Sequence, residues 1–372
     1  MGQKIRDMLM YEETLFRDER AFDRDYIPKD FNFRDTQLRE IALCLKPGIR
    51  GERPLNASII GPPATGKTTA VKLMFDEIQK MTDKVTCVHI NCQIHPAKFT
   101  IFSHMHKAVL GHTPPETGVP FTKVYESIFK KLARDGKSLV VALDDLNYLF
   151  YENKANEIIY DILRAHEVFP GARTAVFGVL SDVSFDYKLE AKVSSIFKPR
   201  EIFFQPYTPK EIIDILRDRS KLGFFPGVIS DKVLEAVADY AFEHADLRVG
   251  IEVLRISALI AESDASRTIK IRHMEKAYSK SKSRNLKSLL SSLNKEEMEL
   301  VNALTKGETN SGELYGLLKE KMSSYSRFYR ALDKLESMKL IDTTPLKKGR
   351  RGRSRRIALR YTEKEVSKAL AT

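Results

Sequence analysis

The sequence predicts an α/β fold: a parallel-sheet core, then a small all-α domain, then a C-terminal domain of three helices and a hairpin. Near-continuous apolar runs, typical of parallel strands buried on both faces, stand at 57–60, 85–91, 138–145 and 174–180. Amphipathic helical patterns then follow one another without a strand. Beyond them, two short strands flank a basic stretch. The expected domains are 1–205, 206–284 and 285–372.

The first apolar strand runs into a glycine-containing loop that opens a helix continuing from Thr69. The loop reads Gly61-Pro62-Pro63-Ala64-Thr65-Gly66-Lys67-Thr68. It matches G-x-x-x-x-G-K-[ST], whose backbone N–H groups turn toward a polyphosphate with help from the helix N-terminus. Lys67 is expected to reach the terminal phosphates, and the Thr68 hydroxyl to bind Mg²⁺. We therefore expect the chain to bind a nucleoside triphosphate.

A pair of acids ends the strand expected at 138–145. Asp144 and Asp145 should lie beside the loop, because ligands collect at the carboxyl ends of strands in open α/β sheets. Asp144 is expected to bind Mg²⁺ through water, and Asp145 to orient or activate the attacking water. Ser181 follows the run 174–180 and is a candidate polar sensor of the γ-phosphate. A strand-terminating turn explains Ser181 equally well.

The all-α region opens with a capping box, in which Thr208 is the N-cap, Pro209 the first helical residue and Glu211 the third. Farther on, Asp246-Leu247-Arg248 opens the third helix of this region. Arg248 then stands where its guanidinium could fold over the phosphates. An arginine in a first helical turn is more often solvated.

Four residues close together in the sequence are of the types that bind zinc: Cys87, His89, Cys92 and His95. The first two lie along a buried strand and no C-x-x-C pair is present, so the spacing does not suit zinc. Structural thiols and a solvent-facing imidazole are expected instead. The three cysteines of the chain fit a reducing compartment without disulfides.

Composition limits the class of protein. The chain has 372 residues, of which 42% are hydrophobic and 30% charged, as in soluble globular proteins of two or three domains. It has no apolar run long enough to span a membrane and no secretory signal at its first residues. The expected location is therefore cytoplasmic.

Three helices are expected in the C-terminal domain, after a helix end rich in Lys, Arg and Ser at 270–284 that is expected to act as a linker. The second is capped by Asn310 and should bury Leu314, Leu317 and Leu318. The third, at 323–339, should bury Tyr325, Phe328, Leu332, Leu335 and Met338. Its opposite face presents Ser323, Ser326, Arg330 and Lys334, with Arg327 at the edge.

The net charge of +12 is concentrated between Pro345 and Arg360, where no acid occurs. The basic residues there are Lys347, Lys348, Arg350, Arg351, Arg353, Arg355, Arg356 and Arg360. Because strands flank this stretch, the helices and the hairpin form a winged helix, whose third helix reads the major groove. A tip with Gly349 and Gly352 among arginines suits the minor groove. A solvated tail or a protein-binding module are the alternatives.

Together these motifs resemble the archaeal origin-recognition initiators, AAA+ relatives of the eukaryotic origin recognition complex and its partner loader. The resemblance covers nearly the whole chain and begins at Tyr26-Ile27-Pro28 and Arg34. Further matches are Gln205-Pro206-Tyr207-Thr208 at the strand into the lid, Ala245-Asp246-Leu247-Arg248 at the Gly-Asp-x-Arg motif, and the wing Gly349-Arg350-Arg351-Gly352-Arg353-Ser354.

The resemblance implies an AAA+ core, a lid and a winged helix. It implies that ATP or ADP binds at Gly61, Pro62, Pro63, Ala64, Thr65, Gly66, Lys67, Thr68, Thr69, Tyr207 and Arg248, the last as second sensor. Three positions depart from the family at the hydrolysis machinery. Asp145 replaces the usual Glu, Ser181 the usual Asn of the first sensor, and Lys192 the usual Arg of a trans-acting finger. Asp145 and Ser181 have shorter side chains than the usual residues, and the ammonium of Lys192 cannot form the two parallel hydrogen bonds of an arginine. These changes suggest a slow ATPase acting as a switch.

Double-stranded origin DNA is the partner that the resemblance implies, with the replicative helicase and paralogous initiators as further partners and a nucleoid-associated location. The family carries a DNA-contacting helical insertion, which we expect at 109–123 with Lys123 as a contact. The other expected DNA-binding residues are Ser326, Arg327, Arg330, Lys334, Lys348, Arg350, Arg351, Gly352, Arg353 and Arg355.

Two other functions use the same parts. A nucleotide-gated transcriptional regulator would bind a promoter through the same winged helix. An energy-driven remodeller would need stronger catalytic residues than Asp145, Ser181 and Lys192 supply. The family match favours the initiator.

Overall fold

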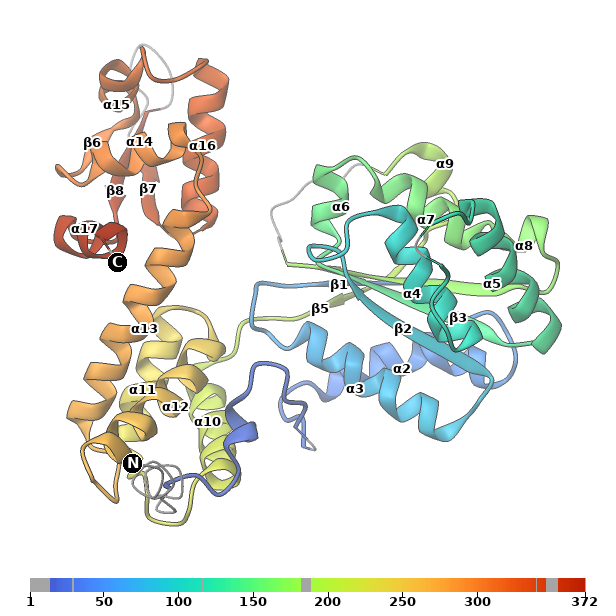
Figure 1. Ribbon diagram of the computed structural model, residues 1–372, viewed down its shortest axis with the longest axis horizontal. Coiled ribbons are helices and arrows are strands. Elements are labelled where there is room, and N and C mark those ends of the chain that lie inside the picture. The colour runs from blue at the N-terminus through green and yellow to red at the C-terminus, as the bar shows by residue number, and fades with distance from the viewer. Residues whose placement is uncertain are drawn as a thin grey trace, which may run out of the picture. The chain divides into compact units, whose positions relative to one another are not determined.

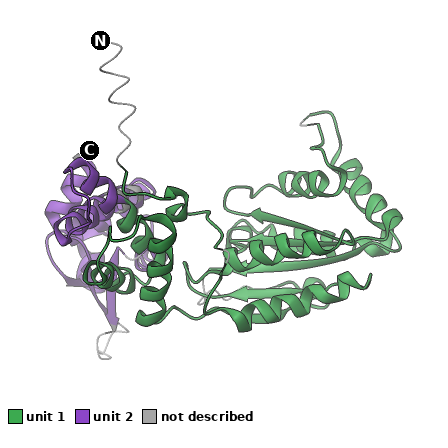
Figure 2. Ribbon diagram, turned by 90° about the horizontal axis from the view of Figure 1, so that it is seen from below, with its two compact units in different colours: residues 1–255 green, residues 256–372 purple. Residues whose placement is uncertain are grey.

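The computed structural model describes residues 14–28, 30–115, 117–181, 189–338, 340–345 and 354–371 (Figure 1). Contacts along the chain divide it into two compact units, residues 1–255 and 256–372 (Figure 2). The division falls inside helix α12 (Leu247–Ser263). The domain boundaries expected at 205 and 284 stay predictions.

A five-stranded parallel sheet is the centre of the first unit, as expected. Its strands are β1 (Ala57–Ile60), β2 (Val85–Asn91), β3 (Ser138–Asp144), β4 (Arg173–Leu180) and β5 (Arg200–Phe203). Their order is β2-β3-β4-β1-β5. In the register, Ile60 lies opposite Leu180, and Asn91 opposite Asp144. The ends of β1, β2, β3 and β4 therefore meet at one edge, where the loop and the acids begin.

Helices cover both faces of this sheet (Figure 1). One face carries α2 (Asp35–Ile49) and α3 (Lys67–Met81), and its core includes Phe75 and Phe177. The other face carries α4 (Lys98–Leu110), α5 (Phe121–Asp135), α6 (Asn147–Tyr151), α7 (Ala155–Leu163), α8 (Ala165–Val168) and α9 (Ala191–Ser194). All residues of β3 are buried, since helices pack on both sides of it.

The rest of the first unit is helical. It comprises the short 3₁₀ helix η1 (Glu19–Phe22), α10 (Pro209–Gly223), α11 (Asp231–Glu243) and the beginning of α12. The predicted capping box is confirmed: the Thr208 hydroxyl accepts from the Glu211 N–H at 3.3 Å, and the Glu211 carboxylate accepts from the Thr208 N–H at 2.8 Å. Two rings of the N-terminal segment, Phe16 and Phe22, pack against Phe224 at the end of α10.

The second unit contains the predicted winged helix. Its elements after α13 (Ile271–Ser291) are α14 (Lys295–Leu304), α15 (Ser311–Leu318), α16 (Tyr325–Ser337), β7 (Ile341–Pro345), β8 (Arg355–Leu359) and α17 (Glu363–Ala371). A short strand, β6 (Thr309–Asn310), completes an antiparallel sheet in the order β6-β8-β7. Helix α13 is continuous through the linker expected at 270–284.

Two residues expected in the core of this domain are exposed. Leu317 is 75% exposed, because Leu314 and Leu318 occupy the face of α15 that packs inward. Tyr325 is 56% exposed, because it is the first residue of α16 and precedes the turn at which Phe328 enters the core. Among the helices that the structure describes, none has the length and apolar character needed to cross a membrane.

Candidate functional site

The loop after β1 has the backbone of a phosphate cradle. Gly66, the N-cap of α3, has a φ of 92°, and Ala64 has a φ of 60°. A Cβ at Gly61 would lie 2.3 Å from the Phe204 carbonyl oxygen, so no other residue fits there. The Thr65 hydroxyl donates to the Pro62 carbonyl at 2.9 Å, which closes the turn. The loop N–H groups stand at the positive end of α3, where anions are favoured.

Lys67 is buried beneath the same loop. Its Nζ donates to the Gly61 and Pro62 carbonyl oxygens, each at 2.7 Å. Burial lowers the pKa of Lys67 to about 8, although the charges of Asp144 and Asp145 act in the opposite direction. The ammonium of Lys67 is therefore held against the loop that would surround a phosphate.

Asp144 and Thr68 come together as predicted. The Thr68 hydroxyl donates to Asp144 Oδ2 at 2.7 Å. His89 Nε2, on the neighbouring β2, donates to the same oxygen at 2.9 Å. Burial of Asp144 raises the pKa of its carboxyl, but the hydrogen bonds from His89 and Thr68 outweigh burial and hold that pKa below its ordinary value. Asp144 is thus an anion at neutral pH.

His89 lies along β2, as expected, and its imidazole has a partner there. Its ring lies against the carboxylate of Asp144, and only part of it is exposed. Cys87 and Cys92 are buried free thiols, as expected. Within the described ranges, no three His, Cys, Asp or Glu side chains converge as a metal site.

The carboxylate of Asp145 is fixed from two sides. Asn91 Nδ2, at the end of β2, donates to Asp145 Oδ2 at 3.1 Å. Ser181 Oγ, after β4, donates to Asp145 Oδ1 at 2.9 Å. Asp145 itself has a φ of 52°, an uncommon conformation for a non-glycine residue. The strand order brings Ser181 to the acid pair, where its sensor role stays a prediction, and it also brings in Asn91, which was not predicted.

Arg34 is a second site residue whose role the sequence did not reveal. It is 4% exposed, and its Nε donates to the Thr65 carbonyl at 3.0 Å. A terminal nitrogen donates to the Gln205 carbonyl at 2.8 Å. Its guanidinium lies 3.7 Å from the centre of the Tyr207 ring. A Cβ at Gly66 would lie 2.9 Å from the Tyr207 hydroxyl, so Tyr207 directly abuts the loop, where it was expected.

Arg248 stands at the beginning of α12, after Ala245 in the left-handed region with a φ of 48°. Its guanidinium pairs with Asp246 at 2.7 Å. This hydrogen bond raises the pKa of Arg248, with a smaller contribution from the charge of Asp145. In turn, the charge of Arg248 acts to lower the pKa of Lys67. The arginine is therefore within electrostatic range of the loop and the acid pair.

Lys192, the expected finger residue, lies in the short helix α9. Its Nζ pairs with Glu190 at 2.9 Å and lies 5.5 Å from the centre of the Tyr160 ring. The side chain is more than half exposed. Lys192 therefore lies on the surface of the first unit, where it pairs with side chains of the same unit.

The expected DNA-binding residues of α16 have different environments. Ser326, Arg327 and Arg330 are exposed. Lys334 pairs with the buried Glu297 at 2.8 Å. Arg355 of β8 pairs with Asp333 at 2.7 Å. The wing residues Lys348, Arg350, Arg351, Gly352 and Arg353 lie outside the described residues.

The DNA-contacting insertion was expected at 109–123. These residues comprise the end of α4, a connecting segment and the first turn of α5, where Lys123 is exposed. None of the described residues between the two helices, 111–115 and 117–120, is helical.

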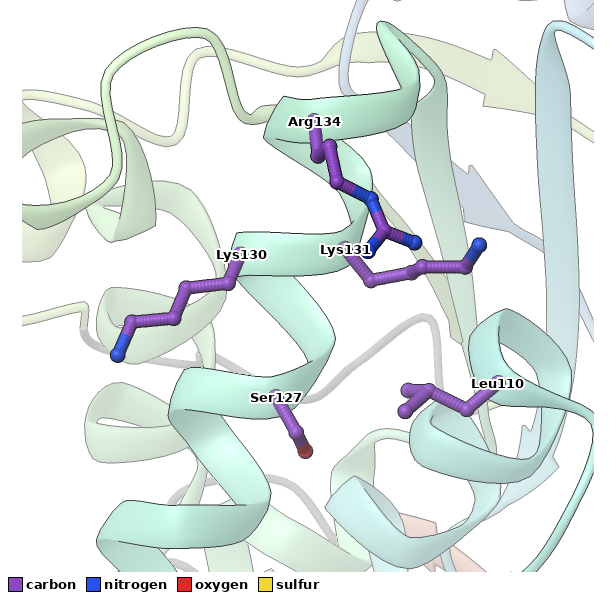
Figure 3. A pocket seen from close by; sticks show the side chains of 5 residues that line it. All are labelled: Leu110, Ser127, Lys130, Lys131 and Arg134. Carbon is purple, nitrogen blue, oxygen red and sulfur yellow. The ribbon is translucent and has the colours of Figure 1, made fainter.

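Beside this segment lies a pocket of about 360 Å³, lined by Leu110, Ser127, Lys130, Lys131 and Arg134 (Figure 3). Lys130 pairs with Glu126 at 3.0 Å. Lys131 and Arg134 pair with Asp135 at 2.7 Å and 3.2 Å. The basic lining is therefore largely neutralised by acids on the same helix.

Family models match two parts of the chain. Residues 213–279 match the Cdc6 AAA+ ATPase-type lid domain, and residues 299–369 match the CDC6 C-terminal winged helix domain. The first range begins inside α10 and ends inside α13, and the second begins inside α14 and ends inside α17.

Relatives match over the full length. ORC1-type DNA replication protein 2 of Methanothermobacter thermautotrophicus is 47% identical, over 97% of this chain and 96% of its own. Its counterpart in Methanosarcina acetivorans is 42% identical, over 98% of each. The Aeropyrum pernix ORC1 protein, solved in complex with DNA, is 25% identical and superposes with a TM-score of 0.77 over 97% of both chains. The chain belongs to the family of ORC1-type DNA replication proteins.

Proposed function

We propose that this chain is a DNA replication initiator, which binds origin DNA through its winged helix and is switched by ATP or ADP. The observation that carries the proposal is the presence in one chain of a complete phosphate loop and of a helix, α16, with an exposed basic face. The names of the relatives support replication as the process, and the DNA complex of the A. pernix protein supports DNA as the partner.

The nucleotide would bind at Gly61–Thr69. The constraints on Gly61 and Gly66 support this, since a Cβ at either position would collide with a neighbour and change the shape of the loop. Lys67 would pair with the phosphates, and Arg248 would approach them from α12. Arg34, through its hydrogen bond to the Thr65 carbonyl, and Tyr207, through its contact with the loop, would keep the loop in the conformation that binds phosphate.

Mg²⁺ would be held by Thr68 and Asp144. They supply a hydroxyl and a carboxylate, the hard oxygen ligands that Mg²⁺ prefers, and these atoms are 2.7 Å apart. The ion would neutralise charge on the phosphates when bound. His89 keeps Asp144 ionised, so the carboxylate is ready to act as a ligand at neutral pH.

Hydrolysis would be slow. Asp145 is the residue available to orient water, and its two oxygens are already engaged by Asn91 and Ser181. Lys192 would have to leave Glu190 to reach a neighbouring protein's nucleotide. We therefore propose that the bound nucleotide acts mainly as a switch for the state of the initiator.

Further partners follow from the same proposal. A replication initiator recruits the replicative helicase and acts beside paralogous initiators, in the cytoplasm at the nucleoid. A second DNA contact would come from the segment 109–123 with Lys123, which is exposed at the first turn of α5. A transcriptional regulator would use the same winged helix, but the full-length relatives are replication proteins.

Genome-wide footprinting with the purified chain tests the proposal. Wild type is compared with Arg327→Ala/Arg330→Ala, and with Lys364→Ala on α17 as the matched control for loss of an exposed cation. Protection of a few repeated sites beside a replication start, lost in the double variant only, is the expected result. Protection confined to scattered promoters would identify a regulator instead.

A further inference from the structure

The ring of Tyr325 is exposed at the start of α16, one turn before Phe328 enters the core of the winged helix. The residue opens α16 and is 56% exposed, although the apolar pattern of that helix predicts a core position. Large aromatic side chains are usually much more deeply buried in a domain core. The exposed ring therefore offers an apolar surface to a binding partner.

Neighbouring aromatic rings hold Tyr325 in a fixed orientation. Its ring meets that of Tyr315 edge to face, with centroids 4.9 Å apart and an interplanar angle of 88°. The Tyr329 ring lies at 4.9 Å and 65°. The Tyr325 hydroxyl donates to the Tyr329 hydroxyl at 3.2 Å. A ring held in this way loses little conformational entropy when it binds a partner.

The start of α16 is held as firmly as the ring. The Ser324 hydroxyl accepts from the Arg327 N–H at 3.2 Å and caps the helix. The carboxylate of Glu296, on α14, accepts from the Ser323 N–H at 3.0 Å. Tyr325 is therefore presented in a defined position next to the exposed Ser326 and Arg327.

We propose that Tyr325 reads thymine in the recognised DNA by packing its ring on the 5-methyl group. This inference rests on the proposed function, in which α16 enters the major groove. In that geometry the N-terminal residues of the recognition helix face the base edges. The thymine methyl is the apolar group that the major groove offers. The hydroxyl hydrogen of Tyr325 is engaged with Tyr329, so the ring is what the side chain presents outward.

The test begins with the sequence that wild type selects from randomised DNA duplexes at one fixed salt concentration. Each thymine of that sequence is then replaced singly by deoxyuridine, which removes only the methyl group. Wild type should lose affinity about fourfold at one or two positions, the value for one buried methyl-sized group. Tyr325→Ala should bind those deoxyuridine and thymine duplexes equally well.

Two variants separate the ring from other effects. Tyr325→Phe should keep the discrimination between thymine and deoxyuridine, because the ring is retained. Leu370→Ala, which removes an exposed apolar side chain from α17 of the same domain, should behave as wild type. Retained discrimination in Tyr325→Ala would overturn the inference, as would an equal loss of affinity on every duplex, random ones included.

A cross-linking measurement on wild type alone tests the inference without relying on a variant that could misfold. A duplex with 5-bromodeoxyuridine at the sensitive position is irradiated with the protein, and the cross-linked peptide is identified. The peptide should contain Tyr325, and a cross-link elsewhere would contradict the inference. If wild type selects no sequence at all, the proposed function fails. If it selects one but cross-links elsewhere, only the assignment of Tyr325 fails.

Discussion

The guanidinium of Arg34 lies over the ring of Tyr207, 3.7 Å from its centre, and donates to carbonyl oxygens of the phosphate loop and of Gln205, between β5 and α10. One buried side chain thus joins the N-terminal segment, the loop and the beginning of the helical region. Because the Thr65 carbonyl is one of its acceptors, the shape of the loop depends on a residue far from the motif in sequence.

Arg34→Ala should weaken the binding of ATP and ADP and lower the stability of the first unit. The Thr65 and Gln205 carbonyl oxygens would lose a buried donor, which costs about 1–3 kcal/mol. Arg34→Lys should restore little, because an ammonium lacks the planar fork and the stacking. Calorimetric titration and thermal unfolding measure both effects. Arg39→Ala, an exposed arginine on α2, is the control and should change neither.

The pKa of Lys67 predicts how nucleotide affinity depends on pH. Burial lowers this pKa to about 8 in the nucleotide-free protein. A bound polyphosphate favours the charged ammonium and must raise the pKa. Binding should therefore take up a proton above pH 8, and affinity should fall as pH rises further. Calorimetry in two buffers of different ionisation enthalpy should show uptake at pH 9 and much less at pH 7. Equal uptake at both values would contradict the assignment to Lys67.

The residues around Asp145 predict slow ATP hydrolysis, and substitutions at Asp145 and Ser181 should increase its rate. Asp145→Glu extends the carboxylate by one methylene, and Ser181→Asn lengthens the sensor. The double variant should hydrolyse ATP several-fold faster with unchanged ADP affinity. Asp145→Asn should abolish hydrolysis while the protein still binds ATP. Phosphate release under multiple turnover is the measurement. A wild-type rate of tens per second, the range of efficient phosphoryl transfer, would remove the reason for expecting any gain.

The fold could be predicted closely from the sequence because the strands and helix caps are encoded by short, local residue patterns. The run expected at 174–180 is β4, and the box at Thr208 and Glu211 caps α10. The roles of His89 and Asn91 were missed because they depend on β2 lying beside β3, which periodicity does not reveal. Tyr325 was misplaced for another reason: the apolar spacing of α16 continues one turn beyond the core that it packs against.

The basic face of α16 and the wing predict a strong dependence of DNA binding on salt. If they neutralise about five phosphates, log K should fall against log salt with a slope of about −4.5. Arg330→Ala should then reduce the slope to about −3.6 if its partner is a phosphate. If it instead reads a base edge, the variant should lose about 1–3 kcal/mol on the recognised sequence only. Titrations at several salt concentrations distinguish the two, and a flat dependence in wild type would exclude the basic surface as the contact.

Lys334 was expected to contact DNA, but its ion pair with Glu297 predicts a role in stability. Glu297 is 5% exposed, and its carboxylate also accepts from the Asn294 N–H at the cap of α14. Lys334→Ala would leave that buried carboxylate without its cation, at a cost of about 1–3 kcal/mol. Glu297→Gln in the same chain should recover part of the loss, since a neutral amide is cheaper to bury.

Unfolding of the full chain in urea measures this loss, with Lys319→Ala, an exposed lysine at the end of α15, as the control. The salt slope of DNA binding should remain that of wild type, because the ammonium of Lys334 is committed to Glu297 and not to a phosphate. A variant of unchanged stability with a smaller slope would restore the DNA contact that the helix pattern predicts and would mean that Lys334 leaves Glu297 when DNA binds.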